Sequence, residues 1–155
     1  MFAEIETRIR KAKKAFKQLN YSPKQISAKE FHDYMTGEIF SEDTTTLHDV
    51  LDNEFLIIHE VIEISELKKR GRKINKRTIV ESPKTMIYTA HFTAMEQELN
   101  YTFLKKDFFW IKIRLRQHKE SVLEDDPNLP EKLRPEGEEI IEKFSKLITE
   151  SARPS

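Results

Sequence analysis

One run of sixteen residues, 55–70, with the sequence FLIIHEVIEISELKKR, most constrains the fold of this chain. Its length and apolar content predict a helix that begins near Asn53, ends at Gly71 and enters the core. The aliphatic and aromatic residues of its apolar arc are Phe55, Ile57, Ile58, Val61, Ile62 and Ile64. Burying these six side chains would contribute roughly 9–18 kcal/mol, at about 1.5–3 kcal/mol each, before the entropy of ordering is subtracted.

The opposite side of this predicted helix is polar, and it allows two interpretations. His59 pairs with Glu63, and Glu66 with Arg70, each at a separation of four residues. On a solvated face, such pairs would each contribute a few tenths of a kcal/mol. The same spacing is also that of metal ligands, because HEVIE, residues 59–63, differs by one residue from the HExxH motif of zinc hydrolases. The sequence leaves both interpretations open.

In the metal hypothesis, Glu63 takes the place of the second histidine of the motif, and Glu60 is the catalytic general base. A second long helix presents further ligand types along one face, at Tyr88, His91, Met95 and Glu98. The hypothesis therefore names His59, Glu63, His91 and Glu98 as metal ligands. Such a mixed nitrogen and oxygen set suits a divalent zinc, manganese or iron ion.

The first forty residues predict two further helices. An apolar stripe with helical spacing runs through Ile5, Ile9, Ala12, Phe16 and Leu19. Ser27 and Glu30 have the spacing of a capping box, so a short helix is expected from there to Met35, with Gly37 ending it. Further along, only turns are expected over residues 46–52 and 75–81.

The second half of the chain also predicts helices. Ser82 and Pro83 have the types of an N-cap and a first helical residue, for a long helix that reaches about Lys106. Residues 108–123 are ambiguous, because WIKIRLRQ alternates like a strand while its apolar residues also fit helical spacing after an Asp107 cap. We favour a helix, since no partner strand is evident and a lone strand cannot satisfy its backbone.

A last helix follows a proline-rich connector, with its apolar side formed by Ile140, Ile141, Phe144, Leu147 and Ile148. The resulting prediction is an all-α bundle of five or six helices, two of them long and central. We expect residues 1–150 to form a single domain and residues 151–155 to be a frayed tail.

Composition narrows the function classes. The 155 residues contain 27 Lys and Arg against 27 Asp and Glu, so no net charge draws the whole molecule to nucleic acid or membrane. The absence of cysteine excludes disulfides, thiolate ligands and a cysteine nucleophile. No apolar run approaches the roughly 18 residues that span a bilayer, so a soluble, cytoplasmic protein is expected. The 35% charged content, against about 25% in average domains, is consistent with a thermophilic source.

One segment, residues 68–77, is strongly basic. Its seven cations are the candidate nucleic-acid contacts Lys68, Lys69, Arg70, Arg72, Lys73, Lys76 and Arg77. The segment has no aromatic side chain to stack on a base, and Glu66 and Glu81 flank it. We therefore favour a solvated loop over a nucleic-acid contact.

Aromatic residues gather at positions 103 and 108–110. A helix cannot bury three consecutive aromatics, Phe108, Phe109 and Trp110, against one neighbour. We expect one of them to cover a second subunit, which predicts a homo-oligomer, most simply a dimer.

Four segments resemble a family of small archaeal all-α proteins without assigned activity: DYMTGEIF, LHDVLDNEFLIIHEVIEISELKK, YTAHFTAMEQEL and LEDDPNLPEKL. The resemblance implies an archaeal origin and no particular reaction. The leading functional hypothesis is a non-catalytic helical module that self-associates or binds a partner protein. The alternatives are a metal-dependent enzyme, most simply a hydrolase, and nucleic-acid binding through residues 68–77.

Overall fold

The computed structural model describes residues 1–41, 43 and 45–152, and these residues form helices and connecting loops without strands. The α-helices are α1 (Phe2–Gln18), α2 (Ala28–Thr36), α3 (Leu47–Leu51), α4 (Glu54–Lys69), α5 (Thr78–Glu81), α6 (Lys84–Leu104), α7 (Phe108–Gln117) and α8 (Arg134–Ser151). A π-helical segment covers His118–Glu124, and a 3₁₀ turn covers Glu131–Leu133. The all-α prediction is confirmed. None of the helices in the described ranges combines the length and apolar composition needed to cross a membrane.

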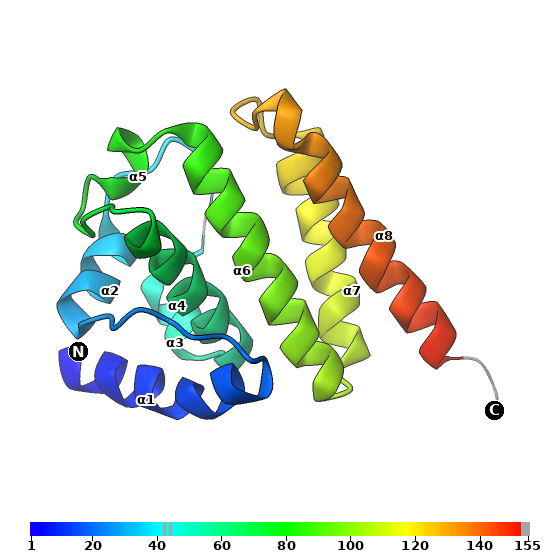
Figure 1. Ribbon diagram of the computed structural model, residues 1–155, viewed down its shortest axis with the longest axis horizontal. Coiled ribbons are helices and arrows are strands. Elements are labelled where there is room, and N and C mark those ends of the chain that lie inside the picture. The colour runs from blue at the N-terminus through cyan, green and yellow to red at the C-terminus, as the bar shows by residue number, and fades with distance from the viewer. Residues whose placement is uncertain (42, 44, 153–155) are drawn as a thin grey trace.

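Helices α4 and α6 pack side by side in the middle of the molecule (Figure 1). Helices α1, α2, α3 and α5 surround α4 on one side, while α7 and α8 pack on the far side of α6. The buried apolar residues form two clusters, one around α1 to α4 and one between α6, α7 and α8. Helix α6 contributes to both clusters and therefore joins the two parts of the core.

Helix α4 begins and ends as its sequence predicts. The Asn53 side chain accepts hydrogen bonds from the backbone N–H groups of Phe55 and Leu56, at 2.9 and 3.1 Å, which caps the first turn. The helix stops before Gly71, whose φ of 86° lies in the left-handed region that favours glycine. Because other helices pack on both sides of α4, His59 and Glu63 are only 2% and 8% exposed. The interpretation of a solvated face is therefore wrong for these two residues.

The predicted capping box of α2 is present. Ser27 accepts from the Glu30 backbone N–H at 3.0 Å, and the Glu30 carboxylate accepts from the Ser27 N–H at 2.9 Å. Helix α2 ends at Gly37, as expected. A Cβ atom at Gly37 would lie 2.5 Å from the backbone oxygen of Lys76, so glycine is needed where the loop after α2 meets the segment after α4.

The predicted number of five or six helices is too low. Residues expected to form only turns are the short helices α3 and α5, and Thr46 and Asp49 form a capping box that stabilises α3. The expectation of two long central helices also needs correction, because α1 and α8 are as long as α4. Helix α6 begins at Lys84 with Pro83 at the N-cap, one residue later than predicted.

Residues 108–123 are helical, as favoured, and the Asp107 side chain accepts from the Trp110 backbone N–H at 3.1 Å. From His118 onward the helix widens into the π form, a variant that single-residue propensities do not indicate. Helix α8 includes Ser151, the first residue of the predicted frayed tail, and residues 153–155 lie outside the described residues.

Candidate metal centre

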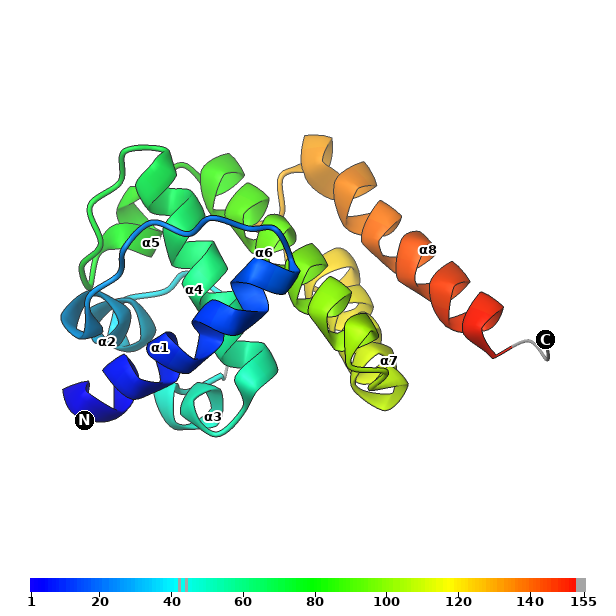
Figure 2. The ribbon, with the colours of Figure 1, turned by 60° about the horizontal axis from the view of Figure 1, so that its bottom comes forward.

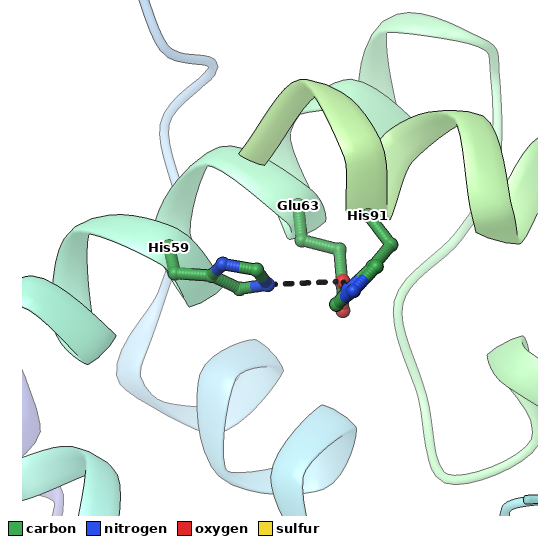
Figure 3. A group of neighbouring side chains, drawn as sticks. All are labelled: His59, Glu63 and His91. Carbon is green, nitrogen blue, oxygen red and sulfur yellow. Dashed lines mark hydrogen bonds and ion pairs between the residues drawn. The ribbon is translucent and has the colours of Figure 1, made fainter. Parts of the chain in front are cut away.

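The structure brings together three of the four predicted ligands. His59 and Glu63 lie one turn apart on α4, and His91 faces them from α6 (Figure 3). One ligand atom from each residue lies within 4.8 Å of the other two. The Glu63 Oε1 atom is 3.5 Å from His59 Nε2 and 3.0 Å from His91 Nδ1. Two atoms bound tetrahedrally to one ion at about 2.0–2.1 Å lie roughly 3.3 Å apart, so this spacing fits a shared metal ion.

Glu98, the fourth predicted ligand, lies outside this group and has a different position. Its carboxylate accepts a hydrogen bond from His59 Nδ1 at 2.9 Å and is completely buried. Arg114 donates to both of its oxygens, at 2.8 and 2.9 Å, and the indole N–H of Trp110 donates at 2.8 Å. Glu98 therefore orients the imidazole of His59 so that Nε2 faces Glu63. Carboxylates hold metal-binding histidines in this way, and their loss weakens metal binding about 10- to 100-fold.

Glu63 is also held by a second residue. The hydroxyl group of Tyr34, on α2, donates a hydrogen bond to Glu63 Oε2 at 2.5 Å. Burial, together with the negative charge of Glu63, raises the pKa of Tyr34 well above its ordinary value, so the phenol stays neutral. This bond leaves Oε1 as the atom that faces His59 and His91.

The protonation states follow from these contacts. Burial alone would lower the pKa of His59, but its hydrogen bonds to Glu63 and Glu98 raise it to about 10. Burial alone would raise the pKa of Glu63, but the bonds from His59 and His91 hold it far below its usual range. Without a metal, His59 is thus an imidazolium between two carboxylates. An ion bound to His59 Nε2 would replace the proton there, because histidine binds metals in its neutral form.

Glu60, the predicted general base, lies beside this group and is partly exposed. Burial and the charge of Glu63 raise the pKa of Glu60 to about 8. No residue in the described part of the chain donates a side-chain hydrogen bond to its carboxylate. Glu60 is therefore a carboxyl group that can bind or release a proton near neutral pH.

Two cavities of the described structure lie away from the three ligands, and neither is lined by any of them. One, of about 470 Å³, lies between α6 and α8, with Phe92, Thr93 and Ile140 among its lining residues. The other, of about 120 Å³, lies between α1 and α4. His91 is the most exposed of the three ligands, and only 25% of its side chain is accessible. The arrangement can hold an ion, but these cavities place no bound substrate next to it.

The basic segment, residues 68–77, is largely neutralised by its own neighbours. The ion pairs join Lys68 to Glu30, Lys69 and Arg70 to Glu66, and Arg77 to Glu38 and Glu81. Lys76 donates to the Thr36 hydroxyl, and Arg72 and Lys73 have no such pair within the described ranges. Phosphate groups would have to compete with these carboxylates, which disfavours the segment as a nucleic-acid contact.

Sequence reasoning did not identify Tyr34, Trp110 or Arg114 as parts of the centre. Tyr34 lies on α2, and Trp110 and Arg114 lie one turn apart on α7, so all three reach the centre only through tertiary packing. The one available signal was the spacing of Trp110 and Arg114, which places an indole N–H and a guanidinium on the same face of a helix.

Comparison with known proteins gives no further guidance: no protein-family profile, curated protein or solved structure matches this chain. The function is therefore inferred from the geometry of the site.

Proposed function

We propose that this protein is a metal-binding helical module that holds one divalent transition-metal ion between His59, Glu63 and His91. The observation that carries the proposal is the convergence of three ligand atoms, from two helices, in a largely buried site. Glu98 orients His59 and Tyr34 orients Glu63, so two of the three ligands are held in place before an ion arrives.

The third ligand, His91, has two ring nitrogens, and the two differ in their surroundings. Its Nε2 atom is buried and has no hydrogen-bond partner among the described residues. In a purely structural network, buried polar atoms are almost always hydrogen-bonded, and each exception calls for an explanation. The proposed ion binds at Nδ1, the ring nitrogen that faces Glu63, so it leaves Nε2 without a partner, and the support for the site comes from the convergence of the three residues.

Zinc is the ion that we expect. Two imidazoles and one carboxylate form a ligand set found in zinc sites, and the distances to Glu63 Oε1 are close to those of a tetrahedral ion. Three protein ligands leave a fourth position open on the ion. The hydrolase alternative would use Glu60 as its base, but the two cavities lie elsewhere. The geometry supports metal binding better than catalysis.

A cobalt titration tests this proposal, because Co²⁺ replaces Zn²⁺ in such sites and gives visible absorption bands that report its ligands. We expect the wild-type protein to saturate at one ion per chain. The variant His91→Ala should bind at least about 100-fold more weakly, because it loses a ligand while the carboxylates remain.

The matched control is His48→Ala, because His48 forms an exposed pair with Asp52 at the same four-residue spacing as His59 and Glu63. This control should bind cobalt like the wild type. Equal cobalt affinity in the wild type and His91→Ala, with circular dichroism showing both folded, would refute the proposed site.

A second proposal, self-association, is supported by two exposed apolar side chains. Phe109, at the start of α7, is 75% exposed, and Leu104, at the end of α6, is 56% exposed. The two lie on either side of one short turn, where both can contribute to an apolar contact with a second molecule. This agrees with the expectation that one of three consecutive aromatics would stay uncovered.

Sedimentation equilibrium tests this surface. We expect the wild-type protein to form dimers at micromolar concentration, and Phe109→Ser to shift the dimer dissociation constant upward by at least about tenfold, as loss of a central apolar contact does. Ile39→Ser is the control, because Ile39 is 47% exposed but lies in the loop after α2. A wild-type protein that stays monomeric would rule out self-association through this surface.

A further inference from the structure

The outer face of α1 is strongly basic. Its cations are Arg8, Arg10, Lys11, Lys13, Lys14 and Lys17. Arg8 is partly exposed and the other five are exposed. In the described part of the chain, none of the six forms an ion pair, whereas most cations of residues 68–77 do. The fold has therefore left the charge of α1 available to a partner.

The position of α1 makes this face accessible. Its apolar stripe, which includes Ile5, Ala12 and Phe16, is buried against the rest of the bundle. At 100° per residue, the six cations spread over the remaining surface of the helix, on its crest and on both flanks. Figures 1 and 2 show α1 along the outside of the bundle, on the side away from α8. The only acidic residues of α1, Glu4 and Glu6, lie in its first two turns, so residues 8–17 contain no acidic side chain.

We propose that this face of α1 binds the phosphate backbone of double-stranded nucleic acid, without sequence preference. An α-helix is about 10–12 Å across, and the major groove of DNA is about 12 Å wide, with phosphates along both sides. Cations on both flanks of α1 can then reach both phosphate rows. The basic stretch of residues 8–17 is about 15 Å long, which spans about four phosphates of each strand.

A duplex fits this surface better than a membrane does. Helices that lie in a membrane surface insert a large apolar face between the lipids. The apolar face of α1 is already buried against the bundle, because Ile5 and Phe16 are at most 3% exposed. Lysine and arginine dominate the exposed face, and such side chains bind phosphates whatever the base sequence. The binding should therefore be electrostatic and strongly dependent on salt.

Fluorescence anisotropy with a labelled DNA duplex of about 25 base pairs tests the proposal, at salt concentrations from about 50 to 200 mM. The test variant replaces Arg10, Lys13, Lys14 and Lys17 by glutamine, which keeps the helix propensity high. The control variant replaces Arg72 and Lys73, the two cations of the basic segment without an ion pair or side-chain hydrogen bond in the described chain, by glutamine.

We expect the α1 variant to bind at least about 100-fold more weakly at low salt. The slope of log K against log salt should fall in magnitude by up to about 3.6, since each of the four lost phosphate contacts removes about 0.9. The control variant should bind like the wild type. Equal binding by the α1 variant would overturn the proposal. So would binding of the wild type to phosphatidylserine vesicles but not to the duplex. Circular dichroism of each variant separates these outcomes from loss of folding.

Discussion

Replacing Glu98 by alanine should lower the free energy of unfolding by about 3–5 kcal/mol, the cost typical of removing one partner from a buried ion pair. Glu98 is fully buried, and it is the counter-charge of Arg114 and of the protonated His59. Burial alone would raise the pKa of Glu98, but the charge of Arg114 and the bond from His59 hold it at about 2. Without this carboxylate, a guanidinium and an imidazolium would remain inside the protein without their main partner.

Urea unfolding followed by circular dichroism measures this change, with Glu96→Ala as the matched control. Glu96 lies two residues away on the same helix, but it is exposed and pairs with Lys143 on the surface, at 3.3 Å. The control should change the unfolding free energy by at most about 0.5 kcal/mol. If Glu98→Ala were equally mild, the buried network would not hold the centre together.

His118 should contribute a loss of about 3 kcal/mol to the free energy of unfolding as the pH decreases from about 6.5 to about 4. His118 is 1% exposed, and its Nε2–H donates to the Gly137 carbonyl at 2.9 Å. Burial, together with the positive charges of His91, Arg114 and His59, lowers its pKa to about 4. Between these pH values the unfolded chain binds a proton at His118 and the folded protein does not, so acid favours unfolding.

The measurement is the unfolding free energy at several pH values for the wild type and for His118→Gln, in which the amide N–H can still donate to Gly137. The two proteins are compared by the slope of the unfolding free energy against pH, because the substitution will also change the absolute stability. Other shifted groups also change the stability with pH: the raised pKa of His59 removes stability above neutral pH, and the lowered pKa values of Glu63 and Glu98 do so below about 4.5. Glu60, with a pKa raised to about 8, acts in the same range as His118 and with the opposite sign, so only the difference between the two proteins reports His118. Parallel curves for the two proteins between pH 6.5 and 4.5 would contradict the assignment.

Local features of the fold could be predicted where a single local interaction, such as an N-cap hydrogen bond, determines them. The cap residues Ser27, Asn53 and Asp107 stand where the structure has helix N-termini, because a side-chain oxygen at these positions satisfies free backbone N–H groups. The short helices α3 and α5 were expected only as turns. Four- and five-residue helices depend on contacts outside the segment, because so short a helix is not stable alone.

At the candidate site, the sequence pattern predicted which residues share a helix face but not whether that face is buried. A spacing of four residues places His59 and Glu63 on one face of α4, whether that face meets water or another helix. The burial of this face depends on α6, which lies against it in the folded chain. The position of His91 could be anticipated, because it shares a face of α6 with other polar residues. The role of Glu98 could not, because it depends on Arg114 arriving from α7.

Anomalous diffraction from crystals grown with zinc tests the central proposal most directly, because it locates the ion among its ligands. We expect one strong peak about 2.0–2.2 Å from His59 Nε2, a carboxylate oxygen of Glu63 and one ring nitrogen of His91. Glu98 should still accept the hydrogen bond from His59 Nδ1. If zinc peaks occurred only at the surface, and His59 and His91 still contacted Glu63 as they do without metal, the centre would be a structural network and not a metal site.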